Sequence, residues 1–174
     1  WGSMLAERFL DPDRREYTVA MVGNGESRIL MPLEISLRSG GKARIVTNAA
    51  KEGHETSIEA VAPGAFRDGL EAFASRAFEV SRVEDYSRLD VIESRGELFA
   101  IEVNGQPMVP DRWFGACASG VGLDEFGYLA GIFGSAIARH SARGGRDLPD
   151  PGSLVPFLPP EFHGLLGAAR GRED

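Results

Sequence analysis

A histidine between two carboxylates is the group of residues in this sequence best suited to acid–base or metal chemistry. His54 lies between Glu52 and Glu55. Nearby carboxylates can tune an imidazole toward the role of general base, and both kinds of side chain bind metals. The spacing matches neither the His-Glu-x-x-His motif nor a run of alternating Asp and Asn ligands. A solvated histidine in a polar loop beside Gly53 is therefore the alternative, and we predict no metal site.

The single cysteine, Cys117, is a second candidate for chemistry. A cysteine nucleophile needs a lowered pKa, which a helix N-terminus or a nearby histidine supplies. A helix predicted to begin at Asp124 follows, but its first acidic residues oppose a thiolate there. His140 lies farther along that helix, roughly 24 Å away at 1.5 Å per residue, so direct pairing is geometrically poor. Inert burial is the alternative, because free cysteines are among the most buried residues.

Two glycine-rich loops raise the question of phosphate binding. One is Gly23-Asn24-Gly25 and the other is Gly40-Gly41-Lys42. A phosphate cradle requires a strand, then the loop, then a helix whose N-terminus faces the phosphate. Both loops lie between predicted strands, and Glu26 beside the first would repel an anion. We therefore predict turns at both places and no cofactor.

Charge and hydropathy exclude further classes of protein. The formal net charge is −7, whereas nucleic-acid binders usually present a basic face, so no nucleic acid is expected as a partner. No window approaches ~18 consecutive apolar residues, so no membrane span is expected. One cysteine allows no intrachain disulfide, which fits a cytoplasmic protein. Residues 1–3 precede Met4 and are typical of an expression scar.

The elements that must position these groups are predicted from periodicity. The predicted fold is α+β, with an antiparallel sheet of about six to seven strands in two meanders separated by a helix over 65–76. The predicted strands cover 17–22, 27–37, 43–48, 56–61, 78–83, 89–93 and 98–103. Arg95-Gly96 and Asn104-Gly105 are predicted hairpin turns, the second leading into a strand over 106–109. A short helix over 4–10 is also expected.

Helices and an extended arm are predicted to complete the chain. A short helix is expected over 111–118 and the clearest one over 124–142, both packing on one face of the sheet. Residues 4–146 are expected to form a single domain. The Pro-rich, apolar segment 147–174 cannot continue a helix. It is therefore expected to be an extended arm that packs either on the domain or on a partner.

The predicted helix over 124–142 carries glycines on one face, at Gly127, Gly131 and Gly134. Each glycine costs up to ~1 kcal/mol relative to alanine in a helix, so their presence indicates close approach of another backbone. Packing on the sheet is one explanation, and a homodimer seam or a ligand cleft is the other. The arm would add apolar residues to such an interface: Phe157, Leu158 and Phe162.

Two functional hypotheses follow from these features. Acidity, the apolar arm and the lack of a catalytic constellation favour a non-enzymatic protein-binding module: an adaptor, a chaperone or an immunity-type inhibitor. Its partner would be another protein or a second copy of the chain. The alternative is a small α+β enzyme or ligand-binding protein with a pocket between the sheet and the 124–142 helix. Its acid–base groups would be His54, Glu52, Glu55 and His140, with Cys117 a weaker candidate. The order of elements recurs among small bacterial α+β proteins, which by itself licenses no function.

Overall fold

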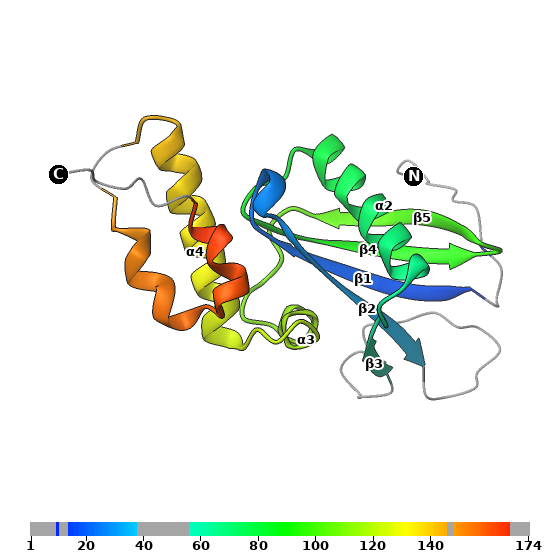
Figure 1. Ribbon diagram of the computed structural model, residues 1–174. Helices are drawn as coiled ribbons and strands as arrows, with labels where there is room; N and C mark the ends of the chain where they lie inside the picture. The colour runs from blue at the N-terminus through cyan, green and yellow to red at the C-terminus, as the bar shows by residue number, and fades with distance from the viewer. Residues whose placement is uncertain (1–9, 11–13, 38–55, 146–147, 168–174) are drawn as a thin grey trace, which may run out of the picture.

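Strand β1 (Arg15–Val22) is the centre of a five-stranded antiparallel sheet with the order β3-β2-β1-β4-β5 (Figure 1). The computed structural model describes residues 10, 14–37, 56–145 and 148–167. The other strands are β2 (Ile29–Leu37), β3 (Thr56–Ala60), β4 (Tyr86–Ser94) and β5 (Glu97–Asn104). The predicted α+β fold with one antiparallel sheet is confirmed, with five strands in the described residues instead of six or seven. The predicted helix over 4–10 falls almost wholly outside the described residues, as does the whole predicted strand over 43–48.

Helix α2 (Ala65–Ser81) covers one face of the sheet. Leu70, Ala74 and Phe78 recur every fourth residue, so they lie on one side of the helix, and all three are fully buried. They pack against alternate residues of β1 and β4: Tyr17, Val19, Met21, Leu89 and Val91. The strand predicted over 78–83 is wrong, because the apolar spacing of α2 continues through Phe78. The helix ends at Arg82, a left-handed residue with φ 53°.

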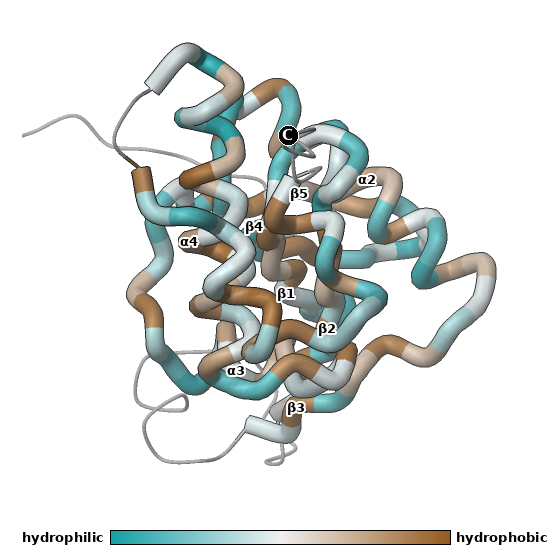
Figure 2. The backbone as a smooth tube through the Cα atoms, turned by 60° about the vertical axis from the view of Figure 1, so that its left-hand side comes forward, coloured by the Kyte–Doolittle hydropathy of each residue, from teal (hydrophilic) through white to brown (hydrophobic). Residues whose placement is uncertain are grey.

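The opposite face of the sheet is covered in part by α3 (Arg112–Ser119) and α4 (Glu125–Ala142). Each helix begins at an aspartate that caps it. Asp111 accepts a hydrogen bond from the backbone N–H of Phe114, and Asp124 accepts one from the N–H of Gly127. Figure 2 shows hydrophobic stretches (brown) in the strands between the helices and hydrophilic stretches (teal) along α2. No helix among the described residues is long and apolar enough to cross a membrane.

The C-terminal segment forms two 3-10 helices, η2 (Pro151–Phe157) and η3 (Pro160–Leu166), instead of the predicted extended arm. A proline begins each of them, where its missing N–H costs nothing. Both pack on the glycine face of α4. A Cβ added at Gly131 would lie 2.8 Å from Leu165, and one added at Gly134 would lie 2.3 Å from Leu166. The glycines therefore serve close packing, and their described neighbours are largely the chain's own C-terminal segment and not the sheet.

The two predicted hairpin turns have different outcomes. Arg95 and Gly96 join β4 to β5, and both have positive φ, as a type I′ turn requires. The hairpin predicted at Asn104-Gly105 is wrong, because β5 ends at Asn104 and no strand follows it in the described residues. Pro107 and Pro110 cannot donate to a strand ladder. The chain instead leads directly into α3.

Candidate functional site

Two neighbouring strands carry polar side chains on the sheet face opposite α2. The register pairs Arg88 with Asn104 and Asp90 with Glu102. Residues directly opposite one another on antiparallel strands have their Cβ atoms about 5 Å apart on the same face. Leu89, between Arg88 and Asp90, points to the α2 side and is buried there. We call these four residues (Arg88, Asp90, Glu102 and Asn104) the polar row.

A β-bulge lies at the polar row. The register shifts between Asp90 and Val91, so that Asp90 pairs with Glu102 whereas Val91 pairs with Ala100. Ile101 is the extra residue, and it is 55% exposed. Bulges are frequent next to active sites because they re-aim side chains. Here the bulge lets β5 present Glu102 beside Asp90 while Ala100 stays in register with Val91.

Arg88 is the most enclosed member of the polar row, with 15% of its side chain exposed. Its Nε lies 3.5 Å from Asp90 Oδ1, and its Nη1 lies 3.5 Å from Asp111 Oδ2. Nevertheless, the buried Nε has no hydrogen-bond partner. An unsatisfied buried donor costs about 1–3 kcal/mol, and more for a charged group. An anionic oxygen brought by a ligand would satisfy this donor, because guanidinium groups bind carboxylates and phosphates.

The other three members of the row supply oxygen atoms. Asp90 Oδ1 accepts a hydrogen bond of 2.9 Å from the hydroxyl of Thr18, which fixes the carboxylate. Glu102 is exposed, and Asn104 is half-buried. Ser87 donates to the backbone carbonyl of Asn104 at 2.7 Å, which holds the end of β5 in place.

Mg²⁺ is a hard cation that binds oxygen ligands, among them carboxylates, waters and phosphates. Within the described ranges, no group of three or more His, Cys, Asp or Glu side chains is arranged to hold a metal ion. Two carboxylates with one carboxamide instead suit Mg²⁺ that arrives with phosphate groups, because such ions are bound through one or two carboxylates and keep several waters. The polar row thus has oxygen ligands for a cation, and it has a guanidinium for the phosphate groups that would arrive with that cation.

Cys117 lies under the same face of the sheet, on α3. It is 1% exposed. Burial raises the pKa of its thiol to about 12, and this outweighs the hydrogen bond to the backbone of Ala20 and the nearby charge of Arg88. A thiol with this pKa is protonated at neutral pH, so the geometry gives Cys117 a packing role.

The other predicted catalytic residues are placed as follows. His54, Glu52 and Glu55 lie outside the described residues. His140 is exposed near the end of α4, where its ring faces Gly145. It belongs to a different element from Cys117, and neither residue belongs to the polar row.

The residues predicted to form an interface lie on α4 and on the C-terminal segment, and these two parts of the chain pack against each other. Gly127 faces the backbone carbonyl of Phe157. Leu158 is buried in the core between the sheet, α3 and α4, and Phe162 packs against it half-buried. The ring of Phe157 is half exposed and lies 6.4 Å from that of Phe126. The glycine face thus has an intramolecular neighbour.

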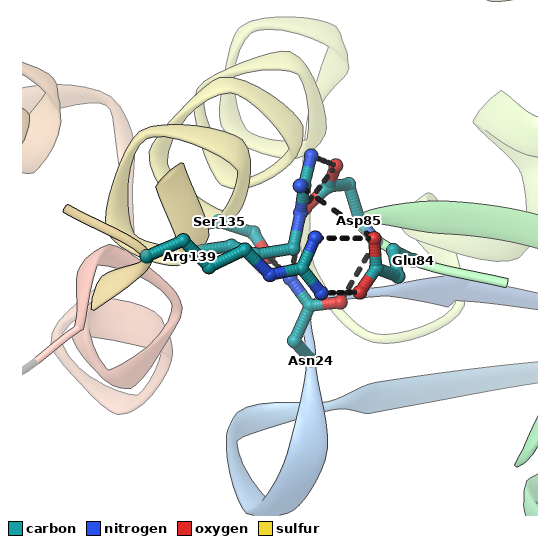
Figure 3. A network of polar contacts seen from close by, with 6 residues as sticks. Asn24, Glu84, Asp85, Ser135 and Arg139 are labelled. Atoms are coloured by element: carbon teal, nitrogen blue, oxygen red, sulfur yellow. Dashed lines mark hydrogen bonds and ion pairs between the residues drawn. The ribbon is translucent and has the colours of Figure 1, made fainter. Parts of the chain in front are cut away.

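A second polar cluster joins α4 to the sheet (Figure 3). Arg139 Nη2 donates to Asp85 Oδ2 at 2.6 Å, and Asn24 Nδ2 donates to Asp85 Oδ1 at 2.8 Å and to Ser135 Oγ at 2.7 Å. Burial opposes the charge of Asp85, but the hydrogen bonds from Arg139 and Asn24 outweigh it and lower the pKa of this carboxyl. The four residues of this cluster (Asn24, Asp85, Ser135 and Arg139) bond to one another, so we assign the cluster a structural role and call it the α4 joint.

The sequence contained a signal for the polar row. Arg88-x-Asp90 and Glu102-x-Asn104 each place two polar residues at period two, with Leu89 or Val103 between them pointing to the other face. Asn-Gly is the strongest short hairpin signal, so the local sequence predicts a turn at Asn104 and gives no sign of its place beside Glu102.

The fold resembles that of a known synthetase. The crystal structure of D-alanyl-alanine synthetase A from Vibrio cholerae O1 biovar eltor superposes with a TM-score of 0.52 and 20% sequence identity. The match covers 72% of this chain and 39% of the synthetase chain. The chain thus spans well under half the length of the synthetase that it matches. At 20% identity the likeness shows the fold alone.

Sequence comparison is more specific than the superposition. Residues 2–123 match the family described as the D-ala D-ala ligase C-terminus, which is more than half of the 174 residues. No curated protein matches the chain. The matched segment contains the whole polar row and ends just before Asp124, the cap of α4.

These findings correct the functional expectation drawn from the sequence. A non-enzymatic protein-binding module with another protein as its partner is contradicted, because the matched family is a domain of an enzyme that acts on small molecules. The hypothesis of a small α+β enzyme is the better supported of the two. The chain belongs to the D-ala D-ala ligase C-terminus family.

Proposed function

We propose that this chain is the nucleotide- and metal-binding part of an ATP-dependent ligase that joins the carboxylate of one small molecule to the amine of another. The polar row is the observation that carries this proposal. It lies within the family match, and it combines oxygen ligands with a largely buried guanidinium whose Nε lacks a hydrogen-bond partner. The family match points to a ligase of ATP-grasp type, and ATP with Mg²⁺ would bring both anionic oxygens and a cation to the polar row.

The chemistry of amide synthesis explains why both parts of the row are needed. A free carboxylate does not condense with an amine in water unless it is first activated, and ATP with Mg²⁺ supplies that activation when bound. Asp90, Glu102 and Asn104 would hold the cation through oxygen atoms. Arg88 would bind phosphate oxygens and neutralise their charge, as arginine does in phosphoryl-transfer sites.

The substrates are proposed by class. The names of the family and of the Vibrio synthetase specify D-alanine for those proteins. This chain spans 39% of the synthetase's length, so residues beyond those seen here would share in choosing the substrate of any complete enzyme. We therefore propose an amino acid or a similar small carboxylate as the substrate class.

Metal binding in the presence of ATP tests the proposal directly. We expect the chain to bind Mn²⁺, used as a paramagnetic substitute for Mg²⁺, more tightly when ATP is present. Asp90→Asn and Glu102→Gln should each weaken this ATP-dependent binding at least about tenfold, because each removes a charged ligand. Electron paramagnetic resonance of free Mn²⁺ measures the effect.

Glu97→Gln is the matched control, because Glu97 lies on the same strand and is exposed but belongs outside the row. It should leave ATP-dependent Mn²⁺ binding unchanged. If the Asp90 and Glu102 variants bind Mn²⁺ and ATP as well as the parent protein does, the polar row is not the metal site and the proposal fails.

A further inference from the structure

A cavity of about 680 Å³ lies between the second half of α4 and the two C-terminal 3-10 helices. Figure 1 shows η2 (orange) and η3 (red) beside α4. We call this space the tail cavity; its lining includes Ala138, Ala142, Asp150, Val155, His163 and Leu166. Pockets of about 300–1,000 Å³ accommodate small molecules. The tail cavity lies outside residues 2–123, so it belongs to the part of the chain beyond the family match.

The walls of the tail cavity are mostly apolar. Small residues of α4, Ala138 and Ala142, form one side, and Val155 and Leu166 form the other. The helices leave space here because an alanine fills much less volume than the leucines that close the neighbouring contacts at Gly131 and Gly134. Such walls favour a ligand with an apolar body, since ligand pockets are lined predominantly by hydrophobic side chains.

The polar side chains that line the tail cavity are Ser141, Asp150 and His163. The Asp150 carboxylate caps η2 by accepting one hydrogen bond of 2.9 Å from the N–H of Gly152, which leaves most of its acceptor capacity unused. His163 Nε2 lies 3.0 Å from the backbone carbonyl of Leu158. A carbonyl only accepts, so Nε2 carries the hydrogen of this contact and donates it to Leu158.

Among the described residues that line the tail cavity there is no lysine or arginine. Asp150 is the one Asp or Glu side chain among those described residues, and a carboxylate beside apolar walls attracts a cation and disfavours an anion. From this complementarity we infer that the tail cavity binds a small organic ammonium ion that carries an apolar group. The ammonium lies against Asp150, and the apolar group lies between Val155 and the alanines of α4.

Three probes of matched shape test the chemical class: 2-phenylethylammonium, neutral 2-phenylethanol and the anion phenylacetate. Isothermal titration calorimetry of the full chain, without nucleotide, measures their affinities. The ammonium should bind at least about fivefold more tightly than the alcohol, because an ion pair at the exposed Asp150 carboxylate adds only a modest amount to the affinity. Phenylacetate should not bind measurably. Equal or tighter binding of phenylacetate would overturn the inference.

Two variants place the binding in the tail cavity. Asp150→Asn keeps the cap of η2, since asparagine caps as well as aspartate, and it should reduce the affinity for 2-phenylethylammonium to that for the alcohol. Ala142→Phe fills the cavity and should abolish binding of both. Asp68→Asn and Ala72→Phe are the matched controls on α2, where both side chains are exposed.

The controls should leave the affinities unchanged, and thermal melting should show that every variant is folded. If Asp150→Asn binds the ammonium as tightly as the parent protein does, the inference is wrong. The test uses neither ATP nor a metal, so its outcome is independent of the proposed ligase function.

Discussion

The two faces of the sheet are built differently from the same strands. Toward α2, β1 and β4 present fully buried apolar residues such as Val19 and Leu89, and the helix closes over them. On the other face, the β1–β2 half is covered by α3 and α4, but β4 and β5 expose the polar row. One face is closed and apolar, and the other is partly open and charged.

This difference teaches how one strand serves both stability and chemistry. Along β4, Leu89 and Val91 point to the apolar face, and Arg88 and Asp90 point to the polar one. Because side chains alternate with period two, the apolar residues fix the direction of the polar ones without touching them. Changes on the first face should therefore act on folding, and changes on the second face on binding.

The largest expected effect is a loss of stability when a buried side chain between α2 and the sheet is truncated. Phe78→Ala removes a fully buried ring of α2 and should lower the free energy of unfolding by about 3–5 kcal/mol. Urea unfolding measures it. Val80→Ala, at a position that is 85% exposed on the same helix, should change stability by less than about 0.5 kcal/mol. Similar effects of the two variants would refute the packing described for α2.

The second prediction concerns the α4 joint, in which the ion pair between Arg139 and Asp85 attaches α4 to the rest of the protein. Helix α4 is one of the two that cover the second face of the sheet. Asp85→Asn should destabilise the protein at neutral pH by about 2 kcal/mol, since it removes a partly buried charged hydrogen bond to Arg139. The pKa of Asp85 is lowered in the folded protein. Its stabilisation is therefore present above the usual carboxyl pKa near 3.9 and is lost as the pH falls through the lower folded value.

Urea unfolding at pH 7 and at pH 3 measures this pH dependence. The difference between the parent protein and Asp85→Asn should shrink on acidification. Asp68→Asn, at an exposed position of α2, should show no such difference at either pH. A gap between Asp85→Asn and the parent that widens at low pH would contradict the assigned pKa shift.

A smaller effect is expected at Asp111, which both caps α3 and contacts Arg88. Asp111→Asn keeps the cap and loses the ion pair, whereas Asp111→Ala loses both. Alanine should therefore cost about 1 kcal/mol more than asparagine in the free energy of unfolding. Chemical denaturation of the two variants separates the cap from the pair, and equal losses would show that the cap contributes nothing.

The smallest effect is expected at Cys117, which lies between the sheet and α3. With its pKa raised to about 12, only roughly one thiol in ten thousand is ionised at pH 8. Native protein should therefore not react with Ellman's reagent over several hours, while protein in 8 M urea reacts completely. Rapid labelling of the native state would show that the face under α3 opens, and that Cys117 is accessible.

Much of the fold could be predicted from periodicity and turn chemistry. The β1–β2 turn at Gly23–Gly25, the Arg95-Gly96 turn and both long helices follow from local signals. The end of α2 could not be predicted, because residues 78–83 are compatible with a strand and only packing against β1 and β4 favours a helix. The C-terminal prolines excluded an α-helix but not a 3-10 helix.

The polar row could not be predicted in the same way. Its residues lie on two strands, and their juxtaposition depends on a register that includes a bulge. A one-residue shift would move every side chain to the other face. Local chemistry drew attention to His54 and Cys117 instead, because each has a recognisable neighbour or reactivity within a few residues.

The strand order has a consequence for how the protein forms during synthesis. Among the described strands β1 is synthesised before the others, yet one of its two neighbours, β4, begins only at Tyr86. The hydrogen bond from Thr18 to Asp90 joins residues 72 positions apart. The β1–β2 hairpin can form early, but half of the central strand stays unpaired until a long loop closes. Nascent chains are therefore most exposed to aggregation at this edge, and the polar row is completed only late in folding.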